Sequence, residues 1–254
     1  MANWKMNLPA EGFEAYGAAL AGRKARADPH EIVVAPPYPF LGRVADAGMS
    51  AGFTVAGQNC SHETAGAFTG EVSAQMLSMA GASYAIVGHS ERRRMFGESN
   101  VLVGKKAAAA VLAGLKPIIC IGEERSVRDD DGTEDFLAAQ LRGAWSADLA
   151  NAGSLIVAYE PVWAVGTGRN ASGEIIAETV SWIRKAMARH WKGVATEKVS
   201  ILYGGSVTPE NVSELWTAGD IDGFLVGGAS LDSARFLRLA EAMSADRQPR
   251  FRRS

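Results

Sequence analysis

The sequence predicts a single-domain α/β protein, a (β/α)8 barrel whose first strand is truncated. Short apolar runs alternate with amphipathic stretches along the whole chain, a pattern that favours parallel strands with helices outside them. The chain has 254 residues, and a barrel of this kind is typically about 250 residues long. Chemically distinctive residues also follow the apolar runs, at the ends of strands where such barrels carry their active sites.

The apolar runs are continuous rather than alternating, which is typical of strands covered on both faces. Seven runs are clear: Ile32–Ala35, Phe53–Ala56, Tyr84–Val87, Pro117–Ile121, Leu155–Tyr159, Val199–Tyr203 and Gly223–Val226. Seven strands alone would also fit an open, doubly wound sheet. The short stub Ala2–Lys5 supplies an eighth strand, and eight βα units favour the barrel.

Amphipathic stretches between these runs predict helices over Phe13–Ala27, Asn100–Ala113, Glu134–Leu149, Glu174–His190, Asn211–Ala218 and Ser233–Met243. Since no low-complexity linker divides the chain, residues 1–246 are predicted to form one catalytic domain. The remaining residues, 247–254, carry Arg247, Arg250, Arg252 and Arg253. We expect them to form a solvated basic tail.

Composition narrows the class of protein. With 26 Lys and Arg against 28 Asp and Glu, the formal charge of −2 gives no field that would attract nucleic acid or an anionic membrane. The chain does not begin like a secretory precursor, and its longest apolar stretch, Ala107–Ala113, is too short to span a bilayer. Cys60 and Cys120 stand apart in apolar contexts, which indicates free thiols in a reducing compartment. We therefore expect a cytoplasmic protein with neither nucleic acid nor membrane as a partner.

Polar or ionisable residues follow three of the predicted strands. Asn3 and Lys5 end the first stub, His89 and Glu91 follow Val87, and Glu160 follows Tyr159. Taken singly, Glu160 could form a structural salt bridge, His89 could be structural and Lys5 could be solvated. Together, an amide, an ammonium, an imidazole and a carboxylate suit proton transfer beside a carbonyl group.

Two of these groups carry an expectation about protonation. A helix that begins after His89 would disfavour the imidazolium through its dipole and keep His89 neutral. Burial under a hydrophobic lid would raise the pKa of Glu160. Both shifts would suit an acid–base pair working near neutral pH.

Two glycine clusters follow the last two strands: Gly204–Gly205–Ser206 and Gly227–Gly228. Backbone without side chains can approach an anion closely, and the loops after strands 7 and 8 of such barrels often bind phosphate. The alternative is that the glycines only serve tight turns. Occurring in series, they favour a phosphorylated substrate.

A third glycine cluster, Gly166–Ala171, superficially matches a dinucleotide-binding motif but lies well past the end of its strand. We expect no cofactor and no metal. Instead, Pro161 stiffens the start of the segment, and Gly166 and Gly168 permit backbone change near its tip. This pattern predicts a mobile lid that excludes water.

With these features, the sequence closely resembles the triosephosphate isomerase family. The matching stretches occur in family order over nearly the whole chain: residues 3–7 (NWKMN), 57–60 (GQNC), 66–71 (GAFTGE), 88–93 (GHSERR), 96–99 (FGES), 120–123 (CIGE), 159–164 (YEPVWA), 166–168 (GTG), 203–206 (YGGS) and 226–230 (VGGAS). The resemblance implies a TIM barrel and a cofactor-independent isomerase of glycolysis and gluconeogenesis. Its reaction would interconvert dihydroxyacetone phosphate and D-glyceraldehyde 3-phosphate through an enediolate.

The resemblance also implies a role for each catalytic residue. Glu160 would be the base, and neutral His89 would polarise the carbonyl and move protons between the enediolate oxygens. Lys5 would stabilise the developing charge, Asn3 would help to hold the oxygens, and Glu91 would be the partner of Lys5.

Three further groups of residues acquire roles by the same resemblance. The phosphate-binding residues would be Gly166, Ser206, Gly227 and Gly228. The lid would comprise Pro161, Val162, Trp163, Ala164, Val165, Gly166, Thr167 and Gly168. The loop that docks into a second subunit would contain Phe68, Thr69 and Gly70, so a homodimer is expected.

The sequence departs from the family pattern in four places. Only Met1 and Ala2 precede Asn3, where the family has several more apolar residues, and we expect the native start to lie upstream. Leu8-Pro9 changes the turn after the first strand, 169–172 (RNAS) is a variant end to the lid, and the arginine tail has no family counterpart.

Two other functions remain open at this point. Another phosphate-binding barrel, such as a sugar-phosphate epimerase or a barrel of tryptophan synthesis, would share the late glycine clusters but not the combination of Lys5, His89 and Glu160. A non-catalytic binding protein on a retained barrel would be consistent with the short first strand alone.

Overall fold

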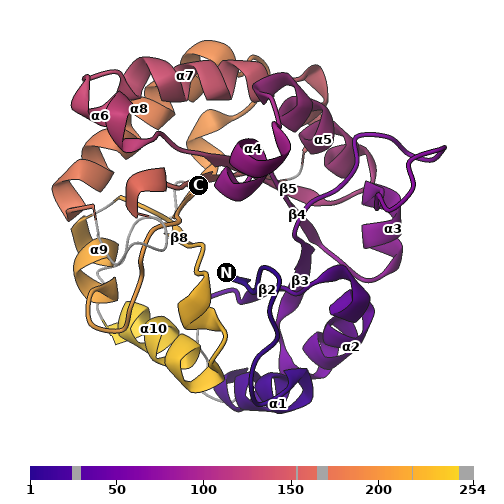
Figure 1. Ribbon diagram of the computed structural model, residues 1–254. Coiled ribbons are helices and arrows are strands. Elements are labelled where there is room, and N and C mark those ends of the chain that lie inside the picture. Colours follow the sequence, from indigo (N-terminus) through magenta and orange to yellow (C-terminus); the bar gives the residue numbers. More distant parts are fainter. Residues whose placement is uncertain (25–29, 153, 165–170, 219, 246–254) are drawn as a thin grey trace.

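The computed structural model describes residues 1–24, 30–152, 154–164, 171–218 and 220–245. Within these residues, eight parallel strands lie side by side in chain order. They are β1 (Ala2–Asn3), β2 (Val33–Ala35), β3 (Thr54–Gly57), β4 (Tyr84–Val87), β5 (Lys116–Ile121), β6 (Ile156–Tyr159), β7 (Ser200–Tyr203) and β8 (Gly223–Phe224). Figure 1 shows the strands at the centre of a ring of helices.

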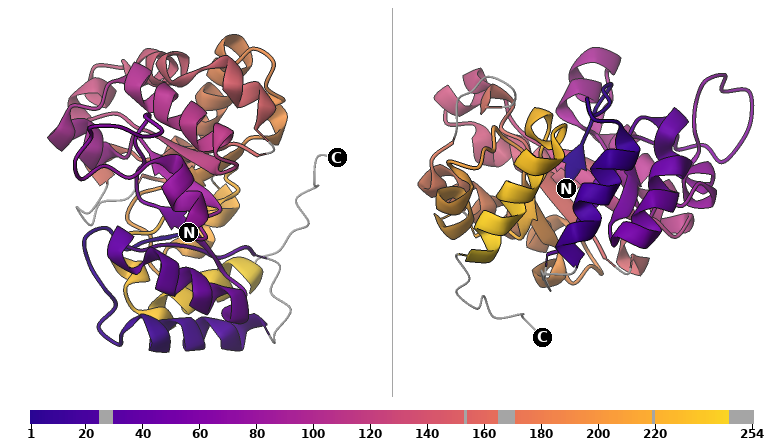
Figure 2. Two further views of the ribbon diagram at one scale, coloured as in Figure 1. Left: turned by 90° about the vertical axis from the view of Figure 1, so that its right-hand side faces the viewer. Right: turned by 90° about the horizontal axis from the view of Figure 1, so that it is seen from below.

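The helices of the ring follow the strands in sequence. They are α1 (Phe13–Lys24), α2 (Leu41–Ala51), α3 (Ala74–Met79), α4 (Ser90–Phe96), α5 (Asn100–Leu112), α6 (Arg125–Asp129), α7 (Thr133–Ala144), α8 (Gly173–His190), α9 (Val212–Ala218) and α10 (Ser233–Ala245). The first and last of them, α1 and α10, pack side by side next to the N-terminus (Figures 1 and 2). The helical layer therefore closes on itself.

The sheet also closes on itself, through the very start of the chain. Ala2 forms a parallel bridge with Val226. The Asn3 N–H donates to the Val226 carbonyl at 2.8 Å, and the Val226 N–H donates to the Met1 carbonyl at 2.8 Å. On its other side, β1 pairs with β2 at Val34 and Ala35. The predicted (β/α)8 barrel is therefore confirmed, and its first strand spans two residues.

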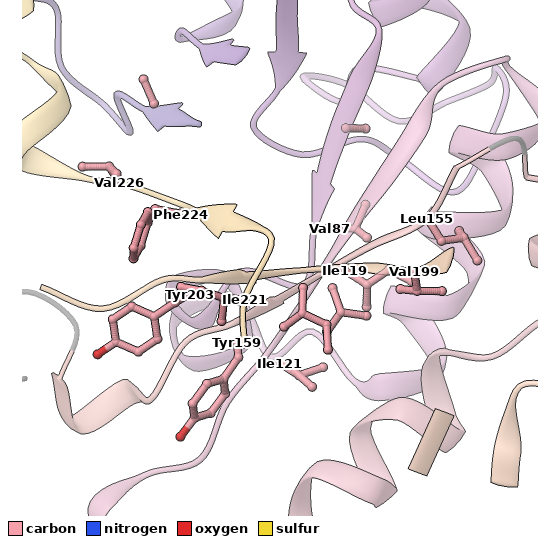
Figure 3. Close-up of a cluster of buried hydrophobic side chains, with 14 of the residues drawn as sticks. Val87, Ile119, Ile121, Leu155, Tyr159, Val199, Tyr203, Ile221, Phe224 and Val226 are labelled. Atoms are coloured by element: carbon pink, nitrogen blue, oxygen red, sulfur yellow. The ribbon is translucent and has the colours of Figure 1, made fainter. Parts of the chain in front are cut away.

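Two buried clusters explain why the strand sequences are continuously apolar. Alternate side chains such as Ile118 and Cys120 point into the barrel. Their neighbours Ile119 and Ile121 belong to a second cluster, which lies between the strands and the helices. Figure 3 shows part of this outer cluster. Because successive strand residues face opposite sides, both sets must be apolar when both sides are covered.

The largest difference from the predicted elements lies in the stretch Glu134–Leu149. The structure has α7 up to Ala144, an extended Trp145, and a short 3-10 helix at Ala147–Asn151. Gly143 packs so closely that an added Cβ would lie 2.5 Å from the Cβ of Asn100. The apolar periodicity of a helix continues through this stretch. The helix nevertheless ends there, because glycine is a weak helix former and Gly143 packs closely against α5.

A cavity lies at the N-terminal end of the barrel, where Met1 is one of the lining residues. It has a volume of about 180 Å³ and is lined mainly by apolar side chains from α10 and from most of the strands, including Val33, Phe224 and Leu239. The Met1 ammonium donates to the Phe224 carbonyl at 2.7 Å at its edge. Continuing the β1–β2 register backwards from Ala2 and Val34 places any residue before Met1 beside Ile32, in this cavity.

We predict that an Ile-Val-Ile-Val extension in front of Met1 raises the midpoint of thermal unfolding. Each buried apolar side chain contributes about 1.5–3 kcal/mol, and ordering each residue costs about 1–2 kcal/mol. The expected net change is a rise on the order of 5 °C, measurable by calorimetry. A Gly-Ser-Gly-Ser extension is the matched control. An equal midpoint for both extensions would show that the cavity does not accept a strand.

Candidate active site

A cavity of about 300 Å³ opens at the C-terminal ends of the strands. Its lining includes Asn3, Lys5, His89 and Glu160, which come from β1, β4 and β6 or directly follow them. The two glycine clusters after β7 and β8 complete the wall: Gly204, Gly205, Ser206, Gly227 and Gly228. The structure thus gathers residues from both ends of the chain into one site.

His89 and Glu160 contact each other directly. The two atoms His89 Nε2 and Glu160 Oε1 lie 3.0 Å apart, and both side chains are buried. The other carboxylate oxygen, Oε2, accepts a hydrogen bond from the Ser90 N–H at 3.1 Å. His89 is the N-cap of α4, and its Nδ1 accepts from the Glu91 N–H at 3.3 Å. A hydrogen bond accepted at Nδ1 requires that nitrogen to be unprotonated, so this contact favours the neutral ring.

The pKa values of this pair are shifted in opposite directions. Burial raises the pKa of Glu160, but the charge and hydrogen bond of His89 and the Ser90 N–H lower it by more, and the net shift is downward. The expectation of a raised pKa for Glu160 is therefore wrong for this arrangement, because close donors outweigh desolvation.

For His89, burial lowers the pKa, while the charge and hydrogen bond of Glu160 raise it, and the net shift is upward. The carboxylate thus favours the imidazolium, and the Glu91 N–H at Nδ1 favours the neutral ring. The neutral state expected from the sequence depends on where the Glu160 carboxylate lies.

Lys5 is held in an unusual backbone conformation. Its φ is +52°, a left-handed value that is uncommon outside glycine. The Asn3 Oδ1 accepts from the Lys5 N–H at 3.0 Å, and the Gln58 Nε2 donates to the Lys5 carbonyl at 2.8 Å. The Lys5 ammonium donates to Glu91 Oε1 at 2.6 Å. Side-chain bonds to both backbone groups offset the strain and aim the ammonium at the cavity.

The glycines of the site differ in what they make room for. An added Cβ at Gly204 would lie 2.8 Å from the Glu160 Cγ, and one at Gly205 would lie 2.1 Å from the Tyr203 hydroxyl. Gly227 lies next to the Lys5 side chain, and a Cβ at Gly228 would meet nothing within 4 Å. The first two therefore serve packing, whereas Gly228 leaves open space in the cavity wall.

The segment after Glu160 is anchored on Glu123. The Val162 N–H donates to the Glu123 carbonyl at 3.0 Å, and the Trp163 indole donates to Glu123 Oε1 at 2.9 Å. The Ser206 hydroxyl donates to the Ala164 carbonyl at 3.0 Å. Of the expected lid, Pro161, Val162, Trp163 and Ala164 are described. The other expected members, Val165, Gly166, Thr167 and Gly168, lie outside the described residues.

Sequence reasoning assigned no role to Glu123 or Arg235. Glu123 lies just after the end of β5, with Gly122 between them, so the strand-end rule that located Glu160 could have found it. Arg235 lies on α10 and lines the 300 Å³ cavity. No rule based on strand ends could have found Arg235, because it reaches the site from a helix.

The chain matches the family model described as triosephosphate isomerase over residues 1–243. The chain belongs to the triosephosphate isomerase family. It is 41% identical over 244 residues to the triosephosphate isomerase of Idiomarina loihiensis, covering 95% of this chain and 96% of the relative. It is 43% identical to that of Rubrobacter xylanophilus, with 95% of each chain covered. A crystal structure of triosephosphate isomerase from Bartonella henselae superposes with a TM-score of 0.83 at 36% identity, covering 95% of this chain and 96% of that one.

Membership of the triosephosphate isomerase family gives the reaction, the interconversion of dihydroxyacetone phosphate and glyceraldehyde 3-phosphate in glycolysis. Family members typically work without a cofactor. Among the described residues, no group of three His, Cys, Asp or Glu side chains is arranged to hold a metal ion. None of the described helices is long and apolar enough to cross a membrane.

We predict that His89→Gln raises the pKa of Glu160, because the charge of His89 that lowers it is lost while burial remains. The measurement is a titration of the Glu160 side-chain carbon by NMR. His62→Gln is the control, since His62 pairs with Glu63 at the surface. The prediction fails if Glu160 titrates at the same pH in both variants.

Proposed function

We propose that the 300 Å³ cavity is the active site and that Glu160 moves the proton between the two carbons of the triose phosphate. One observation carries the proposal: side chains from three separate strands and both glycine clusters line a single cavity. A carbon acid beside a carbonyl ionises readily only where the enediolate is stabilised as it forms. The cavity offers an imidazole, an ammonium and an amide for that purpose.

The contact between His89 and Glu160 suggests how substrate binding would activate both the substrate carbonyl and the base. A carbonyl oxygen that took the place of Glu160 Oε1 as acceptor for His89 Nε2–H would be polarised by it. The same exchange would release the carboxylate from a donor that lowers its pKa, leaving a stronger base. Removal of the carboxylate from His89 would also favour the neutral ring.

Lys5, Glu91 and Asn3 have supporting roles in the proposal. The Lys5 ammonium would stabilise the negative charge on the enediolate. Glu91 would hold that ammonium, which it contacts at 2.6 Å, and Asn3 would fix the Lys5 backbone and bind substrate oxygen. Ser206, Gly227 and Gly228, together with Gly166, would bind the phosphate through backbone N–H groups, and Arg235 would add positive charge to the cavity.

We also propose that the protein is a homodimer in the cytoplasm. The expected docking loop is exposed, and Phe68 in it is 46% accessible. Met6 and Met79 are 94% and 88% accessible, and apolar exposure of this extent is typical of an interface. Both cysteines are buried free thiols, which is consistent with a reducing compartment. Residues 247–254, for which the sequence predicts a basic tail, lie outside the described residues.

We predict that Glu160→Asp lowers kcat about 100-fold with little change in KM. The shorter side chain withdraws the carboxylate by about 1 Å, and misplacement on this scale costs roughly that factor. A coupled assay of glyceraldehyde 3-phosphate isomerisation measures it. Glu134→Asp, on the outer helix α7, is the control. Near-normal kcat in Glu160→Asp would remove Glu160 from the role of base.

We predict that the active species is a dimer by light scattering and that Phe68→Asp shifts it towards the monomer. A charge at this position would be desolvated in the interface without a partner. Phe136→Asp is the matched control, because Phe136 is also exposed, at 37%, but lies on α7. A fully active monomeric wild type would contradict the dimer proposal.

A further inference from the structure

Arg93 is a half-buried arginine of α4 that joins three parts of the barrel. Its Nε donates to the Gly88 carbonyl at 2.8 Å, and its Nη2 donates to the Cys120 carbonyl at 3.1 Å. Its Nη1 donates to Asn100 Oδ1 at 2.6 Å. One guanidinium thus holds the end of β4, the end of β5 and the start of α5.

The Gly88 carbonyl is the group that links Arg93 to His89. Gly88 directly precedes His89 and has a φ of +68°. An added Cβ there would lie 2.7 Å from Val103 Cγ2 and 3.0 Å from Arg93 Nη2. The guanidinium packs against the open side of this glycine. By holding its carbonyl, Arg93 fixes the peptide plane from which the His89 side chain projects.

The Cys120 carbonyl links Arg93 to the backbone that carries Glu160. The next residue on β5, Ile121, accepts from the Glu160 N–H at 2.7 Å. Gly122 then packs so tightly that an added Cβ would lie 1.8 Å from the Glu160 carbonyl oxygen. A displacement of β5 relative to β4 would therefore change the separation of Glu160 and His89.

Arg93 lies beside the substrate cavity rather than in it. A second cavity, of about 280 Å³, is lined by Gly88, Ser90, Arg93, Gly122 and Glu160 among others. Glu160 lines both cavities. Burial lowers the pKa of Arg93, and Glu160 is one of the groups that oppose this shift. The guanidinium and the carboxylate thus line the same second cavity.

We propose that Arg93 is a positioning residue for the isomerisation: by bonding the Gly88 and Cys120 carbonyls it sets the geometry between His89 and Glu160. The proposal rests on the function proposed above. A planar guanidinium presents several donors in a rigid fork, whereas a lysine ammonium is a single point. Charge alone would therefore not replace Arg93.

The test compares Arg93→Lys, Arg93→Met and Arg93→Ala with Arg43→Met, which removes an exposed arginine paired with Glu14. We expect kcat to fall about 100-fold in Arg93→Met and about 10-fold in Arg93→Lys, since misplacement by about 1 Å costs up to 100-fold. KM and the inhibition constant of inorganic phosphate should change less than about threefold, because Arg93 does not contact the substrate. Arg43→Met should keep normal kcat.

Chemical rescue separates positioning from general stability. Guanidinium chloride at low millimolar concentration should restore part of kcat in Arg93→Ala, because the adjacent 280 Å³ cavity gives the ion a path to the vacated site. Sodium chloride at the same ionic strength should not. Circular dichroism at the assay temperature establishes which variants are folded.

Several results would overturn the proposal: normal kcat in a folded Arg93→Met, wild-type kcat in Arg93→Lys, or loss confined to KM. If Arg93→Met and Arg93→Ala do not fold, the kcat of Arg93→Lys decides the question. An inactive wild type would instead count against the proposed function. The two failures are therefore distinguishable.

Discussion

Closure of the barrel by a two-residue strand is the constraint on which the rest of the structure depends. Ala2 and Asn3 must pair with β2 on one side and with Val226 on the other. This pairing places Asn3 and Lys5 in one cavity with Gly227 and Glu160. Without it, Asn3 and Lys5 would not be held in the cavity that Glu160 also lines. The few hydrogen bonds that close the barrel at β1 thus also position the site residues at the C-terminal ends of the strands.

The electrostatics of the site follow from how few charges are buried there and how closely they are paired. Glu160 is almost fully buried, and the carboxylate is kept charged by His89 and the Ser90 N–H. Lys5 is more exposed and is paired with Glu91. A buried carboxylate becomes a stronger base when a hydrogen-bond donor leaves it to bond the substrate instead. In the proposed mechanism, the arrangement in the structure is the state before that exchange.

Much of the fold was predictable because a strand that is buried on both faces has a continuously apolar local sequence. Tyr84–Val87 is apolar at every position, and the structure covers it on both faces. Strand-end positions likewise identified His89 and Glu160 as neighbours, since the ends of parallel strands meet at one edge. The break of α7 before Trp145 was not predictable, because it depends on the close packing of Gly143 against Asn100. Arg235 was missed because its helix, not its position after a strand, brings it to the cavity.

The sequence by itself determined the class of fold, the family and the residue types of the site, because periodicity, strand-end position and motif order are local properties of the chain. Tertiary structure alone decided the protonation environment. The lowered pKa of Glu160 comes from groups 70 residues away in sequence, and burial alone predicts the opposite direction. Tertiary structure also decided which groups Arg93 bonds. In the sequence, Arg93 is only one of three consecutive arginines. Only the folded chain brings the Gly88 and Cys120 carbonyls within reach of its guanidinium, because hydrogen bonds depend on distances that sequence separation does not specify.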